Sequence, residues 1–331
     1  MKKNAQETAI LRVQNLGVKF RGDGADVLAV RNASFEIPEG KTLGLVGESG
    51  CGKSVTALSI LRLVPPAGTI SGGEVLYRGK NLLAMSVDDI CAVRGKEIAM
   101  IFQEPISALN PVFTIGYQVA ESVKKHFGAS GKEARDRTVE LLQKVGIPNP
   151  GRRFHSYPHE FSGGMRQRAM IAMALAASPS VLIADEPTTA LDVTIQSQIL
   201  DLLLSIQESQ KMSLLLITHN LGIVANLADH IAIMYAGEIV ESGKIKDIFS
   251  GPSHPYTRGL FEAIPKIGAM KKKLAAIPGT VPTLTAEPSG CVFHPRCPMG
   301  IPECMEKPVE MVNAGRGHYA RCIRVKAGLK N

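Results

Sequence analysis

The chain contains no tryptophan and no long apolar run. Aromatic residues make up only 5% of its 331 residues, yet 45% are hydrophobic, which is ordinary for a globular protein. No apolar stretch approaches the roughly 18 residues of a membrane-spanning helix. The first six residues are polar and no apolar segment follows them, so we expect no secretory signal. These absences predict a cytosolic protein with one large domain or two smaller ones.

Negative charge is scarce towards the C-terminus. The formal net charge is +8, and residues 241–331 carry 14 Lys and Arg against 7 Asp and Glu. A basic region can indicate nucleic acid or an anionic membrane surface as a partner. No segment resembles a nucleic-acid-binding module, so we interpret the region as a solvated basic face and expect no nucleic-acid partner. The six cysteines should stay reduced in the cytosol unless they bind metal.

A glycine-rich octapeptide fits the phosphate-loop pattern G-x-x-x-x-G-K-[ST]. It reads Gly47-Glu48-Ser49-Gly50-Cys51-Gly52-Lys53-Ser54. The apolar run before it and the helix-compatible segment after it give the strand–loop–helix context that this pattern requires. Inward-facing N–H groups and the positive end of the helix would cradle phosphate. Lys53 would reach the β- and γ-phosphates of a nucleotide, and the Ser54 hydroxyl would hold Mg²⁺. A glycine-rich turn that binds nothing is the alternative.

Polar residues follow three further apolar strands. Gln103 ends the first, where a side-chain amide can touch both Mg²⁺ and an attacking water. Asp185 and Glu186 end the second, and these residues suit Mg²⁺ coordination and polarisation of a water aimed at the γ-phosphate, respectively. His219 ends the third strand. Ligands bind at the carboxyl ends of parallel strands, so we expect these side chains to converge on one phosphate.

A second glycine turn, Ser162-Gly163-Gly164, lies in the segment 161–168, which runs directly into the apolar helix 169–177. Free N–H groups and the helix dipole make such a turn an anion site by geometry.

Hydrophobic periodicity predicts an α/β fold. Alternation of apolar and polar residues indicates a half-buried strand at 10–20, and a second strand is expected at 27–37. Two segments with helical spacing, 115–127 and 132–145, form a helical insert between the nucleotide motifs. Residues 231–235 and 238–242 are predicted to pair as a hairpin.

Together these motifs resemble the ATP-binding subunit of an ABC transporter, over about residues 10–245. In that family Gln103 corresponds to the Q-loop, 161–165 to the signature, 190–192 to the D-loop and His219 to the switch histidine. The resemblance also implies that Phe20 stacks on adenine, although core packing is the alternative. It implies ATP sandwiched between two ATPase subunits, one giving the P-loop and the other Ser162, Gly163 and Gly164.

Two departures from the family pattern concern the signature and the switch. The signature reads FSGGM where LSGGQ is commoner, and Asn220 follows His219 where Asp is usual. Both leave the Ser-Gly-Gly core and the catalytic side chains Glu186, His219 and Gln103 intact, so we expect ATP hydrolysis.

The C-terminal region resembles the extension of oligopeptide/dipeptide importers, a family that includes nickel importers. The resemblance rests on the segments 254–256, 277–279 and 291–298. It implies a second, homologous ATPase, two membrane permeases and an extracytoplasmic binding protein as partners. The subunit would then sit peripherally on the cytoplasmic face of the inner membrane.

These observations predict an ABC-type ATPase domain at 8–245. It would have a mainly parallel sheet core, an antiparallel β subdomain and a helical subdomain at about 104–178. A small Cys-rich extension would occupy 246–331. Half of the 20 prolines lie in 241–331, so we expect this extension to be rich in loops and held by something other than a large core.

Four cysteines cluster in the extension, namely Cys291, Cys297, Cys304 and Cys322. The C-x₂₋₄-C pairs that structural zinc prefers are missing, and four thiolates on irregular loops better suit an iron–sulfur cluster. The family resemblance implies a [4Fe–4S] cluster here, while zinc and unrelated buried thiols are the alternatives. The motif lies far beyond His219 and shows no link to the phosphate site, so we expect a structural or docking role.

Two other classes of function compete with peptide import. One is a soluble ABC ATPase acting on ribosomes or DNA, which usually has two cassettes or a coiled-coil insertion. The other is a regulatory nucleotide-binding module without turnover, which the presence of both Glu186 and His219 disfavours. Within the importer family, nickel or another small solute is the alternative cargo.

Overall fold

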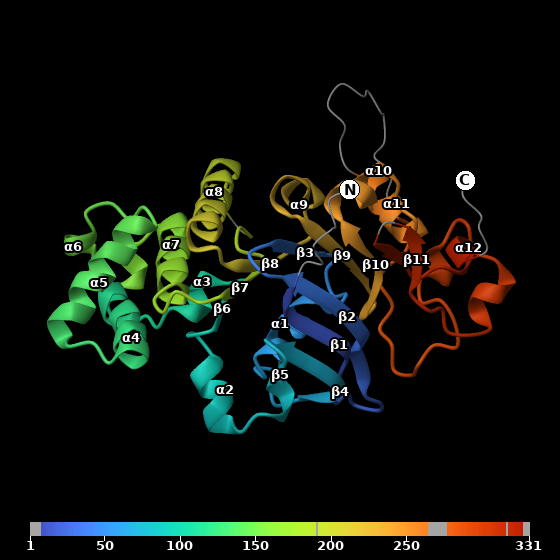
Figure 1. Cartoon of the computed structure of the whole chain (residues 1–331), viewed down its shortest axis with the longest axis horizontal. Coiled ribbons are helices and arrows are strands. Elements are labelled where there is room, and N and C mark those ends of the chain that lie inside the picture. Colours follow the sequence, from blue (N-terminus) through green and yellow to red (C-terminus); the bar gives the residue numbers. More distant parts are fainter. Residues whose placement is uncertain (1–7, 190, 264–276, 316, 327–331) are drawn as a thin grey trace. The chain divides into compact units, whose positions relative to one another are not determined.

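The computed structural model describes residues 8–189, 191–263, 277–315 and 317–326. The chain folds into two compact units (Figure 1). The first unit joins Met1–Ala84 to Leu216–Asn331, and the second is Met85–Leu215. The second unit is therefore inserted into the first, and it contains the predicted helical insert.

An antiparallel sheet opens the first unit. Its strand order is β2-β1-β4-β5, with bounds β1 (Ala9–Phe20), β2 (Val27–Pro38), β4 (Gly68–Tyr77) and β5 (Lys80–Asn81). The alternating apolar residues of β1 are buried, as predicted, except for the half-buried Phe20, but the register shifts between Val13 and Leu16. Asn15 lies at that irregularity with a left-handed φ of 50°, which asparagine tolerates better than most residues.

The strands that carry the P-loop form a second sheet in this unit. β3 (Thr42–Val46) pairs in parallel with β9 (His230–Tyr235), and β9 forms the predicted hairpin with β10 (Glu238–Lys244). Two short strands of the extension, β12 (His318–Ala320) and β11 (Val312–Gly315), continue from β10 in antiparallel pairing. All five residues of β3 are buried, as expected for a strand covered on both faces.

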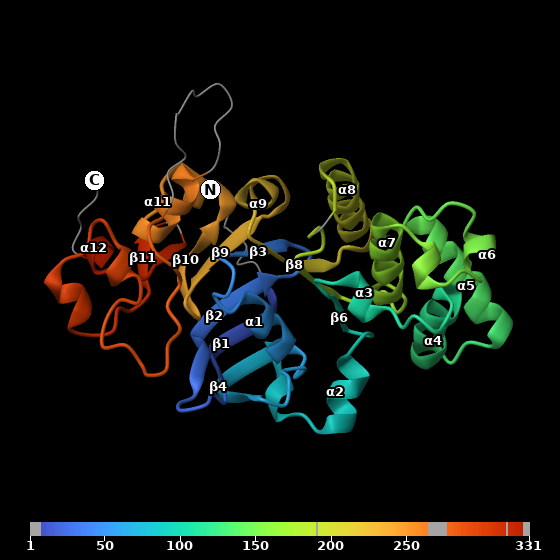
Figure 2. The same ribbon diagram turned by 180° about the vertical axis from the view of Figure 1, so that it is seen from behind.

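Short helices complete the first unit, and Figure 2 shows them from behind. α1 follows the P-loop and contacts β1 and β2. The helices are α1 (Lys53–Ile60), α9 (Leu221–Leu227), α10 (Ile245–Ser250), α11 (Pro255–Glu262) and α12 (Ile323–Lys326). Three 3₁₀ turns are η1 (Leu82–Ala84), η3 (His294–Arg296) and η4 (Pro302–Met305).

The second unit combines two parallel strands with helices. β6 (Ile98–Ile101) pairs with β7 (Val181–Asp185), and β8 (Ser213–Thr218) leads the chain back to the first unit. The helices are α2 (Val87–Val93), α3 (Pro105–Ala108), α4 (Ile115–Phe127), α5 (Gly131–Lys144), α6 (Pro150–Arg153), α7 (Gly163–Ala174) and α8 (Val193–Gln210), with the turn η2 (Pro158–Glu160). Thr114 and Ser130 cap α4 and α5 by accepting backbone N–H groups, which explains where both helices begin.

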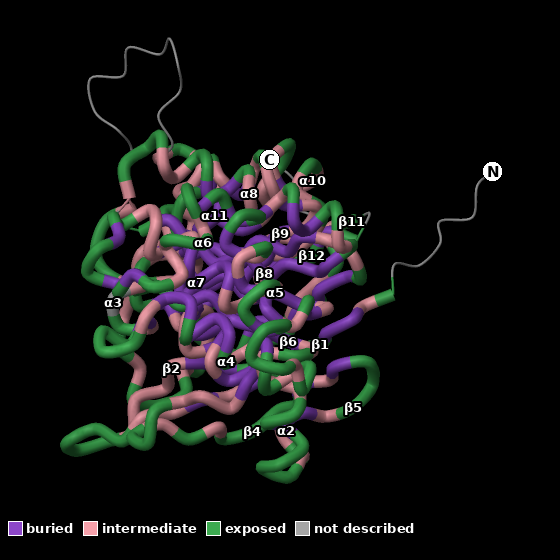
Figure 3. Tube along the Cα trace, turned by 90° about the vertical axis from the view of Figure 1, so that its left-hand side faces the viewer, coloured by how far each residue is buried: buried purple, intermediate pink, exposed green. Residues whose placement is uncertain are grey.

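The C-terminal extension shares a hydrophobic core with the nucleotide-binding strands. Val292, Phe293 and Tyr256 belong to one buried cluster with Val46 of β3 and Ile233 of β9. In Figure 3 the buried tube runs through β9 and β12. The prediction of a loop-rich extension is confirmed, but the expectation that something other than a large core holds it is wrong.

In the described residues no helix combines the length and apolar character needed to cross a bilayer.

Candidate functional site

The P-loop turns sharply between β3 and α1, and two of its glycines are required by close approaches. A Cβ at Gly47 would collide with the carbonyl oxygen of Met234, and one at Gly52 would lie 2.5 Å from that of Ala29. Gly52 also has a left-handed φ of 106°, where side chains are strained. The loop therefore owes its shape to backbone packing against neighbouring segments, and a turn of this kind can cradle phosphate with its inward-facing amides.

Lys53 is buried within this loop. Only 5% of the residue is exposed, and its Nζ donates hydrogen bonds to the carbonyl oxygens of Gly47 (2.8 Å) and Glu48 (3.0 Å). Cys51 is also buried, and burial raises the pKa of its thiol. The ammonium is thus held beside the loop at which a phosphate would bind, in an environment that strengthens its interaction with an anion.

Gln103 and Glu186 meet at the carboxyl ends of two parallel strands. Ile101 of β6 pairs with Ala184 of β7, so the residues after these strands lie side by side. The Gln103 amide Nε2 donates to Glu186 Oε2 at 3.4 Å, and Thr189 Oγ1 donates to the same oxygen at 2.8 Å. Asp185 is buried at the end of β7. The structure brings these predicted residues together within the second unit.

The backbone of Glu186 is unusual. Its φ is 46°, in the left-handed region that non-glycine residues seldom adopt. Such a conformation costs free energy and persists where the surroundings fix it, often at functional sites. Here it directs the carboxylate towards Gln103 and Thr189.

The Ser-Gly-Gly turn forms the exposed N-terminus of α7. Ser162 is the N-cap, and its hydroxyl accepts the Met165 N–H at 3.3 Å. Ser162 and Gly163 are exposed, and a Cβ at Gly164 would lie 2.8 Å from Ile195 of α8. The helix that follows, α7, is 12 residues long, and the positive end of its dipole lies at this turn.

The switch and adenine-stacking candidates lie in the first unit. His219 follows β8, and Asn220 caps α9 by accepting the N–H groups of Gly222 and Ile223. Asn and Asp cap helices equally well, so the departure at this position preserves the local fold. Phe20 is half-buried at the end of β1, against Gly68 of β4. Of the predicted D-loop, Ala190 lies outside the described residues.

The four clustered cysteines line one small cavity of about 20 Å³ in the extension. Burial raises the pKa of the Cys291 thiol to about 11, and it also raises the pKa values of Cys297 and Cys322. Sulfur donors of this number suit an iron–sulfur cluster. Within the described ranges, however, no three His, Cys, Asp or Glu side chains are arranged to hold a metal ion. The predicted Cys-rich metal site is therefore not supported as a formed ligand set.

The cysteine motif shows no link to the phosphate site in the sequence, but the structure places one of its neighbouring residues against the P-loop. Arg296, next to Cys297, forms an ion pair with Glu48 of the P-loop at 2.7 Å. From the sequence, Arg296 and Tyr256 are named only as parts of family segments, without any role at the P-loop. Thr189 was not predicted as a site residue. The sequence offered one signal for it, since its hydroxyl comes three residues after the strand-end acid Glu186.

Three features together define an ABC-type ATPase. They are the strand–P-loop–helix unit, the strand-end carboxylate with its glutamine, and the Ser-Gly-Gly turn at the start of a helix. The ABC transporter family profile matches residues 30–189, and that of the oligopeptide/dipeptide transporter C-terminal region matches residues 240–304. The chain belongs to the ATP-binding subunits of the oligopeptide/dipeptide branch of ABC transporters.

Relatives and solved structures agree with this assignment. A peptide import ATP-binding protein of Brucella melitensis is 48% identical over 327 residues, covering 95% of this chain and 97% of the relative. A protein of the same description from Brucella abortus is 49% identical over 313 residues, covering 95% and 94%.

Two ABC cassettes of known structure share the fold. The MJ0796 cassette, in a dimeric post-hydrolysis state with ADP and Pi, has a TM-score of 0.64 and 28% identity, covering 71% of this chain and 98% of the cassette. CbiO1 of Clostridium perfringens has a TM-score of 0.63 and 26% identity, covering 74% and 92%. These matches confirm the predicted P-loop ABC ATPase fold and support ATP hydrolysis.

Proposed function

We propose that the chain is the ATP-hydrolysing subunit that energises import of dipeptides or oligopeptides through an ABC importer. The observation that carries this proposal is the pairing of Gln103 with Glu186 beside a buried Asp185, in a chain whose P-loop holds Lys53 in place. The relatives named as peptide import ATP-binding proteins support peptides as cargo. Nickel or another small solute is the alternative cargo within the same branch.

The nucleotide roles follow from the chemistry of each group. Residues 47–54 would bind the phosphates through backbone amides, with Lys53 supplying positive charge. Ser54, Gln103 and Asp185 carry the oxygen ligands that Mg²⁺ prefers, and they would hold it. Glu186 would act as general base on the attacking water, assisted by His219, while Phe20 would stack on adenine.

A complete site would need a second, homologous ATPase subunit. The turn Ser162-Gly163-Gly164, whose first two residues are exposed, would bind the nucleotide held by the facing subunit. The MJ0796 cassette is described as dimeric, which supports this arrangement. Closure on ATP and opening after hydrolysis would then move two membrane permeases, to which an extracytoplasmic binding protein delivers the peptide. We place the subunit peripherally at the cytoplasmic face of the inner membrane, with 8–245 as its ATPase domain and 246–331 as its extension.

We expect the isolated chain to be a weak ATPase, because half of each site would come from the facing subunit. Adding the partner ATPase and the permeases in vesicles should raise turnover, and peptide-loaded binding protein should raise it further. The measurement is ATPase rate against protein concentration, with peptide, nickel or neither. Full turnover by a demonstrably monomeric sample would refute the assembly, and stimulation by nickel alone would change the cargo.

We also propose that Cys291, Cys297, Cys304 and Cys322 hold a [4Fe–4S] cluster, with zinc as the alternative. Support comes from their lining a common cavity. Cluster binding requires thiolates, so the raised pKa values of the buried thiols mean that assembly must release protons. The bound cluster would link the loops of the extension covalently.

Anaerobic purification should give a brown protein with about four irons per chain. Cys297→Ser should lose the iron, whereas the matched control Cys91→Ser should keep it, because Cys91 is exposed in the second unit and far from the group in sequence. Colourless protein with one zinc per chain would show that the four cysteines hold zinc and not an iron–sulfur cluster. Protein without any bound metal would refute a metal site and leave two buried and two half-buried thiols in the extension.

A further inference from the structure

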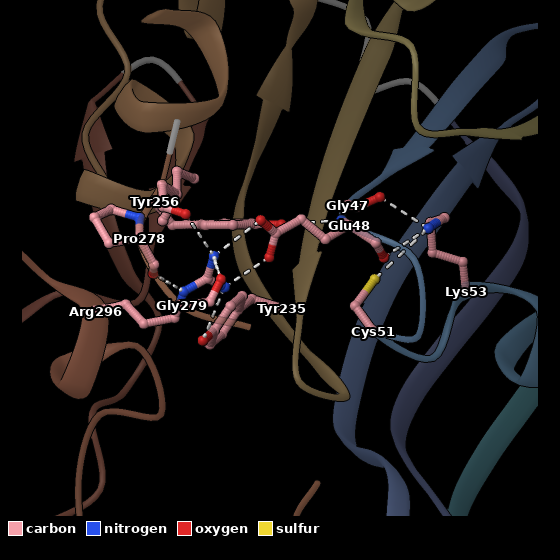
Figure 4. A network of polar contacts seen from close by, with 10 residues as sticks. Gly47, Glu48, Cys51, Lys53, Tyr235, Tyr256, Pro278, Gly279 and Arg296 are labelled. Carbon is pink, nitrogen blue, oxygen red and sulfur yellow. Dashed lines mark hydrogen bonds and ion pairs between the residues drawn. The ribbon is translucent and has the colours of Figure 1, made fainter. Parts of the chain in front are cut away.

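Glu48 is the P-loop residue through which the C-terminal extension contacts the nucleotide site. Figure 4 shows Arg296 and Tyr256 of the extension directed towards it, while Lys53 approaches from the other side of the loop. The backbone N–H of Glu48 donates to the Tyr256 hydroxyl at 3.0 Å. Its carbonyl oxygen accepts from Lys53 Nζ at 3.0 Å and from the Cys51 N–H at 3.3 Å. Every polar group of this one residue is therefore bonded.

The Arg296–Glu48 pair has the geometry of a strong interaction. Nη1 donates to Glu48 Oε2 at 2.7 Å and Nη2 to Oε1 at 3.0 Å, so both carboxylate oxygens are engaged. The Arg296 side chain is 6% exposed and that of Glu48 29%, which limits screening by solvent. Bidentate guanidinium–carboxylate pairs fix orientation as well as contributing energy.

The remaining donors of Arg296 are also satisfied, which fixes the guanidinium in position. Nε donates to the Pro278 carbonyl oxygen at 2.8 Å, and Nη2 also donates to that of Gly279 at 3.2 Å. Nη1 lies 3.4 Å from the Tyr235 hydroxyl, and the guanidinium stands over the Tyr235 ring. Arginine can present such a rigid fork, whereas lysine offers a single point charge.

Tyr256 is anchored as firmly as Arg296. It is fully buried at the start of α11 and packs against Tyr235 and Phe293, with ring centroids at 4.7 Å and 5.3 Å. His254, two residues before Tyr256, caps the helix because its Nδ1 accepts the Tyr256 N–H. Burial lowers the pKa of His254 to about 4. His254 therefore stays neutral near neutral pH and keeps this acceptor.

A buried carboxylate holds that helix start on the sheet. Glu241 of β10 accepts the N–H of His254 at 3.0 Å and that of Ser253, and its Oε1 lies 2.6 Å from His318 Nε2 of β12. The extension is thus tied to the same sheet that carries the P-loop strand.

We propose that Arg296 and Tyr256 are positioning residues for ATP binding, which act by holding Glu48 and with it the P-loop in its phosphate-binding shape. This inference rests on the proposed nucleotide function of the loop. Loop amides that are already oriented lose little freedom when phosphate binds, so affinity is higher than in a loop that must order itself. Releasing either contact raises the Kd for ATP. It changes turnover at saturating ATP little, since neither side chain reaches the reacting atoms.

The test measures the Kd of a fluorescent ATP analogue for the full chain, alongside KM and kcat in the assembled complex. Arg296→Gln should weaken binding about tenfold, as expected for loss of hydrogen bonds between charged groups. Arg296→Lys should restore affinity only in part, because lysine keeps the charge but not the fork. Tyr256→Phe removes the hydroxyl alone and should weaken binding about threefold, as for one neutral hydrogen bond.

A double-mutant cycle shows whether Arg296 acts through Glu48. Glu48→Gln should weaken binding about as much as Arg296→Gln, and the double variant should be little worse than either single one. Arg258→Gln is the matched control, since Arg258 lies in α11 and donates to the carbonyl oxygen of Pro252, within the extension. It should leave the Kd unchanged.

The outcomes separate this inference from the proposed function. Wild-type chain that binds no nucleotide would refute the function itself. Wild-type chain that binds nucleotide, with Arg296→Gln, Tyr256→Phe and Glu48→Gln binding it equally well, would overturn the positioning role alone. Additive effects of the Glu48 and Arg296 changes would also overturn it. If Arg296→Gln disturbs folding of the extension, Tyr256→Phe and Glu48→Gln still decide the question.

Discussion

Glu186→Gln is expected to lower turnover in the assembled complex by about 10²–10⁴-fold, the range typical for loss of a general base. The amide keeps the size of the side chain and an acceptor for the Thr189 hydroxyl, which lies 2.8 Å from Glu186 Oε2. It cannot take a proton from water. ATP affinity should remain near that of the wild type, because only an interaction of the transition state is lost.

The control for this substitution is Glu104→Gln. Glu104 is an exposed acid one residue after Gln103, so it tests whether any charge loss near the end of β6 has the same effect. Single-turnover rates and nucleotide affinity should be measured for both variants. Near-normal hydrolysis by Glu186→Gln, or an equal loss of hydrolysis in Glu104→Gln, would contradict the role of Glu186 as general base.

Short motifs predicted the strand-end residues well, because they obey local rules. An apolar strand followed by a polar residue places that residue at the carboxyl edge of a parallel sheet. Gln103 and Glu186 lie 83 positions apart, yet Gln103 comes two residues after β6, Glu186 comes one residue after β7, and these two strands pair in register. The hairpin β9–β10 was predicted for a similar reason, since its two strands are adjacent in sequence.

The helix α8 shows a signal that was present but not used. Asp192 caps it by accepting the Ile195 N–H at 3.0 Å, and Ile199, Leu203 and Ile206 form a buried stripe at helical spacing. These features can be read from the sequence by the rules applied to α4 and α5. The start and the buried face of α8 are therefore both encoded locally in the sequence.

The contact between Arg296 and Glu48 left no such local trace. The two residues are separated by 248 positions, and any of 38 Lys and Arg residues could pair with any of 30 acids. Glu48 also occupies a variable position of the P-loop pattern, which says nothing about its side chain. Only the tertiary fold, with Phe293 and Tyr256 packed beside the P-loop strand, determines which charges meet.

Lys53→Ala is expected to weaken ATP binding about 10²-fold or more, the scale for removing one partner of a close, poorly solvated charge pair. The substitution removes the ammonium proposed to bind the phosphates and also the hydrogen bonds to the Gly47 and Glu48 carbonyl oxygens, so the loop loses charge and support together. Its effect on affinity should therefore exceed that of Arg296→Gln, which removes support alone. Lys41→Ala is the matched control, because Lys41 directly precedes the P-loop strand but pairs with Asp229 at a half-exposed site. Nucleotide titration with a parallel thermal unfolding scan distinguishes lost binding from lost folding. A Lys53→Ala protein that still binds ATP as tightly as the Lys41 control would remove the P-loop from the proposed mechanism.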